Sequence, residues 1–323
     1  MRAIAQRVLL AVVIVAASVK SYSLHTTTLE DREMMPAVIA SGEARAPNQY
    51  RVLVPLLWKL ATANGVPAQS AERLLVVLGI LFCYAALAVT LHRASGSIPI
   101  TALCLLAFYG AAASGFWFRY RDTFFDVAFT CLGMALVLQR RPSWMAYTLL
   151  SAVAALNRET WLFSLVAAAC SRWAYQRGDA GDSQRRRDAF GLLCATAVAV
   201  GVLFAIRAHY GVRDYHYGVW QYAANLPLLV GAGPASIGQA VWLAGSGVLV
   251  VWLIFALASL ARHVPFVIGF AAPLLGVSFF VSNWAETRIF IPCYAVMIVS
   301  IAGGLGPAVG RLPDAGPVVD RAT

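Results

Sequence analysis

The chain has 323 residues and a net charge of +10, yet only 12% of its residues are charged and 60% are hydrophobic. Soluble domains carry about 25% charged residues, so this composition excludes a soluble enzyme, and also a disordered, collagen-like, coiled-coil or disulfide-stapled chain. It predicts an all-α, polytopic integral membrane protein, because helices satisfy their own backbone hydrogen bonds inside a bilayer.

The hydrophobic runs predict about ten transmembrane helices, since about 20 apolar residues cross the hydrocarbon core. They cover residues 8–24, 70–91, 98–116, 123–139, 143–157, 160–176, 189–206, 236–260, 264–282 and 289–307. The stretch Arg51–Ala63 is shorter and contains Lys59, which favours a helix lying at the membrane interface. We interpret residues 1–310 as one transmembrane domain with a first extracytoplasmic loop at 25–64, and residues 311–323 as a disordered cytoplasmic tail.

Arginine runs predict the orientation of these helices. Arg140-Arg141 and Arg185-Arg186-Arg187 fall on the same side as both termini, and positive residues mark the cytoplasmic side of a membrane protein. We therefore expect cytoplasmic N- and C-termini. The first span follows Arg2 and Arg7 and has only a weak cleavage sequence, which favours a signal-anchor over a cleaved signal peptide. The basic excess is thus a topology signal, and no nucleic-acid partner is expected.

The six cysteines all lie in apolar runs and none has CxxC spacing. We interpret them as packing residues rather than as disulfide or zinc ligands. The chain also lacks a Walker loop, a GxGxxG fingerprint, a GxSxG elbow and an HExxH motif. Any chemistry must therefore come from the polar groups that adjoin the predicted spans.

The first such group lies in loop 25–64, where Glu30 and Asp31 belong to an acidic tetrad with Arg32 and Glu33. A carboxylate held just above the membrane can act as a general base toward a hydroxyl or bind a divalent cation. A solvated loop is the alternative.

The second group opens the span 123–139 and contains Arg119, Arg121, Asp122 and Asp126. Arg119, Asp122 and Asp126 share one helix face by their spacing. Asp126 lies about one turn inside the span, where carboxylates are rare and usually functional. The structural alternative is an ion pair between Asp126 and Arg119 or Arg121.

The third group, Asn157, Arg158 and Glu159 with Thr160, separates two short spans. Consecutive polar residues at this depth cannot all face lipid, so we expect them to line a cavity or to pair with other helices. A tight turn is the alternative. The fourth group, Glu286 and Arg288, precedes the last span, and both side chains can point into one cavity at an extended helix entry.

The segment Arg207–Tyr222 is rich in tyrosine and tryptophan and contains His209 and His216. Aromatic residues populate membrane interfaces, and an interface belt is the simplest interpretation. An aromatic platform that stacks on a sugar is the alternative. The histidines lack a convincing metal-ligand spacing.

The order of these motifs resembles the GT-C glycosyltransferases, which are multi-spanning enzymes that use polyprenyl-phosphate sugars. In the first loop the resemblance rests on Asp31, on Ala40-Ser41-Gly42 and on Tyr50-Arg51 followed by Pro55. Before the last span it rests on Glu286-Thr287-Arg288-Ile289-Phe290-Ile291-Pro292. This element is similar to the His-Lys-Glu-x-Arg-Phe element of some eukaryotic mannosyltransferases, with Asn283-Trp284-Ala285 in place of the basic lead-in. Asn157-Arg158-Glu159-Thr160 looks like an element of uncharacterised bacterial relatives.

The resemblance implies an inner-membrane enzyme that transfers a sugar from a polyprenyl phosphate to an extracytoplasmic glycan, lipid or protein acceptor. The Arg-rich, Lys-poor residue usage, typical of a GC-rich genome, indicates a bacterial origin. Asp31 would be the catalytic base, with Glu30 as second choice, and Arg51, Arg158 and Arg288 would hold the phosphate. The remaining candidates would bind the substrate or orient the arginines: Tyr50, Arg119, Arg121, Asp122, Asp126, Asn157, Glu159 and Glu286. No cofactor or metal site is required, although a divalent cation is compatible with the carboxylates. A transporter or flippase for a lipid-linked or polar solute is the alternative, since intramembrane charges also line transport pathways. A non-catalytic membrane scaffold is the third hypothesis.

Overall fold

A computed structural model describes residues 2–27, 35–45, 48–114, 121–176, 181–211, 263–281 and 291–310. The regular secondary structure of this part of the chain consists of helices, without strands. The long helices are α1 (Arg2–Thr27), α4 (Ala68–Ser95), α5 (Ile98–Ser114), α6 (Arg121–Val137), α7 (Trp144–Asn157), α8 (Trp161–Gln176), α9 (Asp182–Tyr210), α12 (Val264–Val281) and α13 (Ile291–Gly310). The shorter elements are α2 (Pro36–Ser41), the 3-10 turn η2 (Asn48–Tyr50) and α3 (Leu53–Ala63).

Every predicted span except one corresponds to one of these helices, and the predicted interfacial helix corresponds to α3. The exception is the span 236–260, which lies outside the described residues, as does the tail 311–323. Ile4–His25, Ala68–Ser95 and Asp182–Tyr210 are long and apolar enough to cross a membrane. Five described segments are apolar but shorter: Leu53–Ala63, Ile98–Ala112, Trp144–Asn157, Val264–Ser278 and Ile291–Gly306. The all-helical fold is therefore confirmed for the described residues, and membrane-crossing length is found in α1, α4 and α9.

Proline begins the short helix α2 and glycine ends it. Pro36 occupies the first turn of α2, where its missing N–H is not needed. Gly42 ends α2 with φ 81°, a left-handed conformation that favours glycine. This requirement gives a backbone reason for the glycine in the Ala40-Ser41-Gly42 segment.

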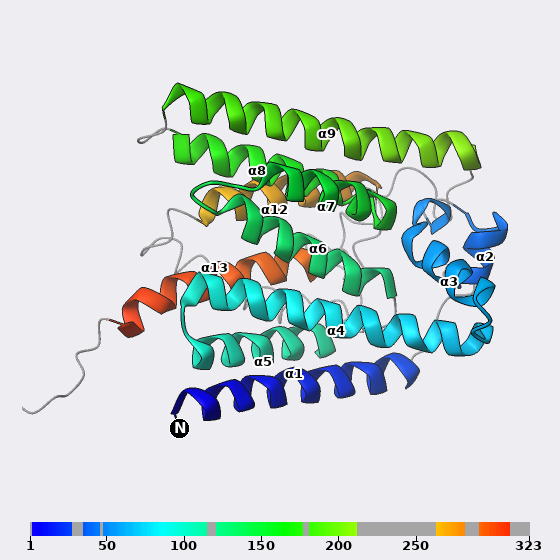
Figure 1. The fold of residues 1–323 in the computed structure, drawn as a ribbon, viewed down its shortest axis with the longest axis horizontal. Coiled ribbons are helices and arrows are strands. Elements are labelled where there is room, and N and C mark those ends of the chain that lie inside the picture. The colour runs from blue at the N-terminus through cyan, green and yellow to red at the C-terminus, as the bar shows by residue number, and fades with distance from the viewer. Residues whose placement is uncertain are drawn as a thin grey trace, which may run out of the picture.

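The long helices lie side by side, and neighbours along the chain run in opposite directions (Figure 1). The small helices α2 and α3 cover one end of this bundle, where α6 begins, α7 ends and α8 begins (Figure 1). We call it the α2–α3 end. At the opposite end α8 finishes and α9 begins.

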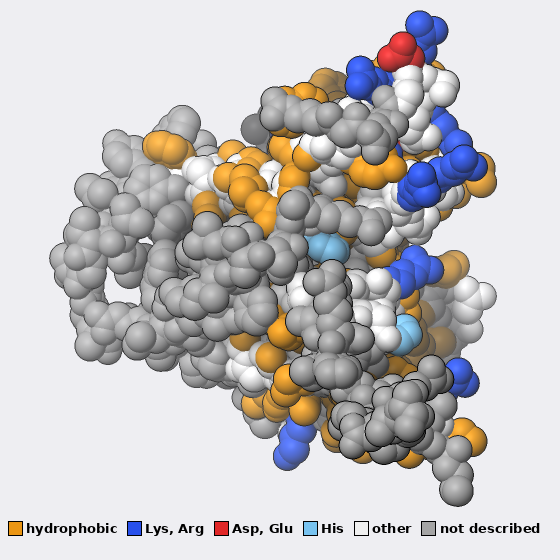
Figure 2. All heavy atoms as spheres, turned by 90° about the vertical axis from the view of Figure 1, so that its left-hand side faces the viewer, with side chains coloured by type: hydrophobic (Ala, Val, Ile, Leu, Met, Phe, Trp, Pro, Cys, Tyr) orange, Lys and Arg blue, Asp and Glu red, His pale blue; other side chains and the backbone are white. Residues whose placement is uncertain are grey.

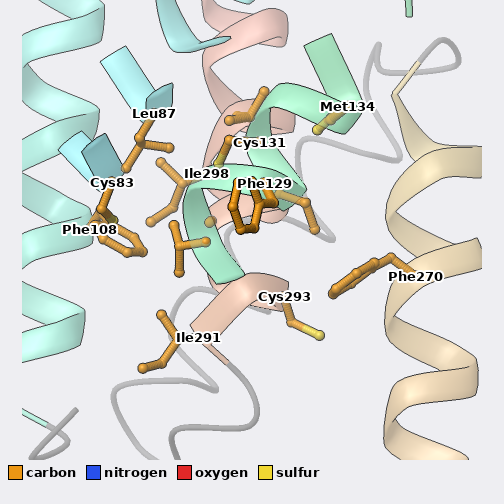
Figure 3. Close-up of a cluster of buried hydrophobic side chains, with 14 of the residues drawn as sticks. Cys83, Leu87, Phe108, Phe129, Cys131, Met134, Phe270, Ile291, Cys293 and Ile298 are labelled. Atoms are coloured by element: carbon orange, nitrogen blue, oxygen red, sulfur yellow. The ribbon is translucent and has the colours of Figure 1, made fainter. Parts of the chain in front are cut away.

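The interior of the bundle is built from α4, α6 and α13. Helix α4 packs against α1, α5, α6 and α13, whereas α8 packs against α6, α9 and α12. Apolar side chains from α4, α5, α6, α12 and α13 meet between them, among them Leu87, Phe108, Met134 and Ile298 (Figure 3). Cys83, Cys104, Cys131 and Cys293 are buried among helices as packing residues. Helices α1 and α9 instead expose most of their apolar surface, since only 22% of each span is buried.

Small residues allow α8 and α12 to approach closely. A Cβ atom added at Gly269 of α12 would lie 2.9 Å from the Cα atom of Ala167 and 2.9 Å from the Cβ atom of Cys170 on α8. Close helix pairs in membranes depend on such small residues.

We expect Gly269→Ala to destabilise the protein by about 1–3 kcal/mol, because the backbones of α8 and α12 must move apart. Gly276→Ala on the same helix is the control. Its added methyl group meets nothing within 4 Å among the described residues, and alanine favours the helix by about 0.5–1 kcal/mol. Denaturant unfolding of both variants in mixed micelles checks the difference, and equal stability would contradict the close packing of α8 and α12.

Candidate functional site

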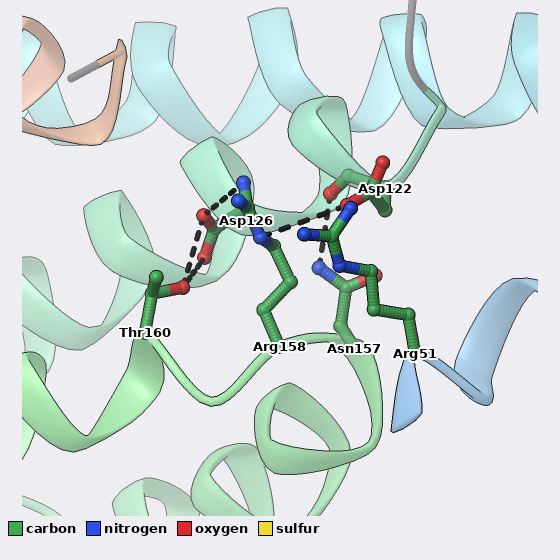
Figure 4. Close-up of polar contacts among 6 residues, drawn as sticks. All are labelled: Arg51, Asp122, Asp126, Asn157, Arg158 and Thr160. Carbon is green, nitrogen blue, oxygen red and sulfur yellow. Dashed lines mark hydrogen bonds and ion pairs between the residues drawn. The ribbon is translucent and has the colours of Figure 1, made fainter. Parts of the chain in front are cut away.

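Charged and polar side chains from three segments meet at the α2–α3 end. They come from the chain before α3, from the first two turns of α6 and from the turn between α7 and α8 (Figure 4). We call them the charge cluster: Arg51, Asp122, Asp126, Asn157, Arg158 and Thr160.

Asp122 lies between two arginines. Its Oδ2 atom is 3.2 Å from Nη1 of Arg51 and 3.6 Å from Nε of Arg158. Asn157 holds the backbone of the same residue, since its side-chain N–H donates to the Asp122 carbonyl at 2.9 Å. The carboxylate of Asp122 therefore joins the first loop to the α7–α8 turn.

Asp126 lies one turn further along α6, on the other side of Arg158 (Figure 4). Nη1 of Arg158 donates to Oδ2 of Asp126 at 3.2 Å. The Thr160 hydroxyl donates to the two carboxylate oxygens at 3.1 and 3.2 Å. The guanidinium of Arg158 thus contacts both aspartates.

The four ionised side chains of the cluster are buried. Arg51 is 9% exposed, Asp122 5%, and Asp126 and Arg158 4% each. Two positive and two negative charges balance, which is required because an unpaired buried charge is strongly unfavourable. Asn157 is only 1% exposed, and its Oδ1 atom has no hydrogen-bond partner among the described residues. That oxygen can accept a hydrogen bond from a bound hydroxyl.

The second half of the first loop is folded so that Arg51 is held in place. The buried Gln49 side chain accepts the Ala44 N–H at 3.1 Å and donates to the Ile39 carbonyl at 2.9 Å. The Val52 N–H donates to the Leu156 carbonyl at the end of α7, at 2.9 Å. Arg51 therefore precedes a backbone contact that fixes its distance from Arg158.

The turn between α7 and α8 directs Arg158 toward α6. Arg158 has extended backbone angles, φ −158° and ψ 146°, immediately after α7 ends at Asn157. Its side chain reaches from this turn to the aspartates of α6 (Figure 4). The prediction that the polar residues 157–160 pair with other helices is confirmed for Asn157, Arg158 and Thr160.

The structural alternative for Asp126 was an ion pair with Arg119 or Arg121 of its own segment. Arg119 lies outside the described residues, so that half of the alternative stays untested. Among the described residues Asp126 pairs with Arg158 and not with Arg121. Consecutive residues of a helix point in different directions, so Arg121 leaves the cluster face of α6. Its Nη2 atom lies 3.6 Å from Oε2 of Glu72 on α4.

A partly open hollow adjoins the cluster. It is small and opens to solvent. Its lining residues are Pro36, Ile39, Arg51, Val54, Pro55, Arg121 and Asp122. Two arginines and one aspartate thus face an otherwise apolar wall from α2 and α3.

Glu159 and Tyr50 lie apart from the charge cluster. Oε2 of Glu159 is 3.7 Å from Nη2 of Arg207 on α9, and both side chains are partly exposed, at 35% and 53%. The Arg207 guanidinium carbon lies 5.4 Å from the centre of the Tyr50 ring. The Tyr50 hydroxyl donates to the Gly211 carbonyl at 3.1 Å. These contacts fasten the first loop to the end of α9.

The remaining predicted residues, Glu30, Asp31, Arg119, Glu286 and Arg288, lie outside the described residues. Ile291, three residues after Arg288 in sequence, is the first residue of α13. It lines a second, small and mainly apolar hollow with Thr123, Phe124 and Val127 of α6. The start of α13 is therefore next to the start of α6.

Within the described part of the chain, no group of three or more His, Cys, Asp or Glu residues could hold a metal ion. Asp122 and Asp126 are both engaged by Arg158. A divalent cation bound between these two carboxylates would have to displace that guanidinium, so this aspartate pair does not fit a metal site.

A second buried ion pair, Arg172–Asp188, lies at the opposite end and was missed by the sequence analysis. Nε and Nη2 of Arg172 are 2.8 and 2.7 Å from Oδ2 of Asp188. The Asp188 carboxylate also accepts hydrogen bonds from Trp144, Gln176 and Gln184. The sequence does not distinguish Arg172 from the exposed arginines near it, but in the structure it is a buried, neutralised residue. The signal available in the sequence was Asp188 itself, an acid directly after three arginines.

Comparison with known proteins identifies no relative: no family model, no curated protein and no solved structure matches this chain.

Proposed function

We propose that this chain is a membrane glycosyltransferase of GT-C type, which moves a sugar from a polyprenyl phosphate to an extracytoplasmic acceptor. The observation that carries the proposal is convergence: three polar groups far apart in sequence, around Arg51, Asp122 and Arg158, form one buried cluster beside a hollow. A transmembrane scaffold alone has no need to bury these charges, each of which is costly in lipid.

The chemistry needs a base and a positively charged environment for phosphate. The acceptor hydroxyl oxygen attacks the anomeric carbon of the donor, and the bond from that carbon to the phosphate oxygen breaks. We assign the acceptor proton to the Asp31 carboxylate. Polyprenyl phosphate leaves with the bonding electron pair, and guanidinium groups stabilise its charge.

The hollow beside the cluster is where we place the phosphate. Arg51 and Arg121 line it, and the apolar side chains of Pro36, Ile39 and Val54 adjoin them. A lipid phosphate combines one charged group with an apolar chain, and this wall offers partners for both. Asn157 and Asp126 would then either bind sugar hydroxyls or hold Arg158 in position.

The position of the cluster favours a transferase over a transporter or flippase. Transport sites lie near the bilayer midplane between repeated halves, whereas this cluster lies where α6 begins and α7 ends, at one end of the bundle. The proposal includes about ten spans, cytoplasmic termini and a location in a bacterial inner membrane, with the α2–α3 end outside.

Asp31→Asn should reduce sugar transfer by at least about 100-fold, because a general base contributes about 10²–10⁴-fold. The assay incubates the purified chain with radiolabelled polyprenyl-phosphate sugars and follows loss of label from the lipid. Glu43→Gln is the matched control, since Glu43 is an exposed acid of the same loop, and it should keep normal transfer.

Two outcomes would contradict the proposal at different levels. Normal transfer by Asp31→Asn and also by Glu30→Gln would exclude the assigned base while leaving the enzyme class in place. Absence of transfer by the unaltered protein from every donor, together with movement of a lipid-linked sugar across vesicles, would favour the transporter.

A further inference from the structure

A basic surface lies at the end of the bundle opposite the charge cluster. Figure 2 looks onto this end, where basic side chains (blue) gather at the top, over the start of α9. We call the following exposed residues the arginine patch: Arg140, Arg141, Arg185, Arg186 and Arg187.

Two helices and a loop bring the patch together. Arg185 donates to the Gln176 carbonyl at the end of α8, at 3.2 Å. Arg172 donates to the Gln139 carbonyl at 3.1 Å and pairs with Asp188. Arg140 follows Gln139 and Arg187 precedes Asp188, and Arg172 contacts both Gln139 and Asp188.

Among the described residues the patch carries an excess of positive charge. Asp188, which follows the three arginines, is neutralised by the buried Arg172. Asp182 is exposed and lies 3.9 Å from Arg185. Arg186 and Arg187 lie in the second turn of α9, where the helix dipole gives cations no stabilisation. Helix stability therefore does not explain these arginines, which leaves the orientation of the helices or a bound anion as the explanation.

An exposed apolar stripe continues from Arg186 along α9. It consists of Phe190, Leu193, Ala197, Val200 and Phe204, spaced three and four residues apart on one helix face. Phe190, Leu193 and Phe204 are 68%, 66% and 75% exposed. At the end of α8, beside the patch, Trp173 and Tyr175 are also exposed. Such aromatic residues populate the headgroup level of a bilayer.

We propose that this surface binds an anionic phospholipid, with its phosphate on Arg186 and Arg187 and its acyl chains along the α9 stripe. Positive charge followed directly by exposed apolar side chains matches a lipid, in which the phosphate adjoins the acyl chains. A nucleic acid would bind the positive charge but would have no apolar part to contact the stripe on α9. The site is distinct from the charge cluster and does not depend on the proposed transferase.

The test titrates the purified full chain in a nonionic detergent with phosphatidylglycerol or phosphatidylcholine and follows the rise in melting temperature. We expect phosphatidylglycerol to bind more tightly, and 1 M salt to reduce that preference. Each arginine near an anionic surface raises the binding affinity about fivefold. Arg186→Gln with Arg187→Gln should therefore weaken phosphatidylglycerol binding about 25-fold and leave phosphatidylcholine binding unchanged.

Two paired variants make the result specific. Lys59→Gln with Arg73→Gln removes the same charge from exposed residues at the α2–α3 end and should leave phosphatidylglycerol binding unchanged. Arg186→Lys with Arg187→Lys keeps the charge and should keep the preference, so its loss in a folded protein would contradict electrostatic recognition.

Equal affinity for phosphatidylglycerol in the unaltered protein and the Arg186→Gln/Arg187→Gln protein would overturn the proposal and leave these arginines as orientation signals only. Equal protection by inorganic phosphate or by a short RNA would likewise exclude a lipid site.

Discussion

Arg158→Gln should destabilise the protein by about 3–5 kcal/mol, which is the usual cost of removing one partner of a buried ion pair. Arg158 is the residue that contacts both aspartates of α6. Without it Asp126 keeps only the Thr160 hydroxyl as a partner among the described residues. Asp122 keeps Arg51. The loss should appear as a lower denaturant midpoint in mixed micelles.

A double-mutant cycle with Asp126→Asn separates the pair from its surroundings. The double variant should regain part of the stability that Arg158→Gln loses, because no charged partner is then left unpaired at Asp126. Arg207→Gln is the surface control. Its pair with Glu159 is partly exposed, and such pairs contribute about 0–1 kcal/mol. Equal losses in Arg158→Gln and Arg207→Gln would contradict the burial of the charge cluster.

Asp188→Ala should destabilise the protein by about 3–5 kcal/mol as well, for a related reason at the other end of the bundle. The change leaves Arg172 buried with no carboxylate partner among the described residues, and Trp144, Gln176 and Gln184 each lose an acceptor. An unpaired buried donor is unfavourable by about 1–3 kcal/mol. Thermal unfolding in detergent measures the effect.

Asp182→Ala is the matched control for Asp188→Ala. Asp182 is 86% exposed and pairs loosely with Arg185 at 3.9 Å, so its removal should change the melting temperature little. Asp188→Ala that folds should also keep sugar transfer if the α2–α3 end holds the active site. Stability like that of the unaltered protein in Asp188→Ala would show that Arg172 does not depend on this carboxylate.

The helices themselves could be predicted because each apolar run is bounded by charged or polar residues. The boundaries agree closely for α5, α7, α8 and α12. Five of the predicted site residues, Arg51, Asp122, Asp126, Asn157 and Arg158, meet in one cluster. This convergence could be anticipated because polar residues inside apolar runs must find partners in other segments.

The choice of partners could not be predicted, because it depends on which helix ends meet. Asp126 pairs across helices with Arg158 rather than with Arg121 of its own helix. Glu159 points away from its neighbour Arg158 and contacts Arg207. Sequence spacing describes one helix at a time, and these contacts join different helices.

The sequence by itself determined the positions of the helices and the polar groups that interrupt them, because hydrophobic length and local charge depend on neighbouring residues only. Tertiary structure decided which arginines are buried in ion pairs and which are exposed. Arg172 and Arg186 look alike in sequence, yet Arg172 is buried against Asp188 and Arg186 is exposed on the arginine patch. That difference arises from the packing of α8 against α9, which places one guanidinium inside the bundle, beside a carboxylate, and leaves the other on its surface.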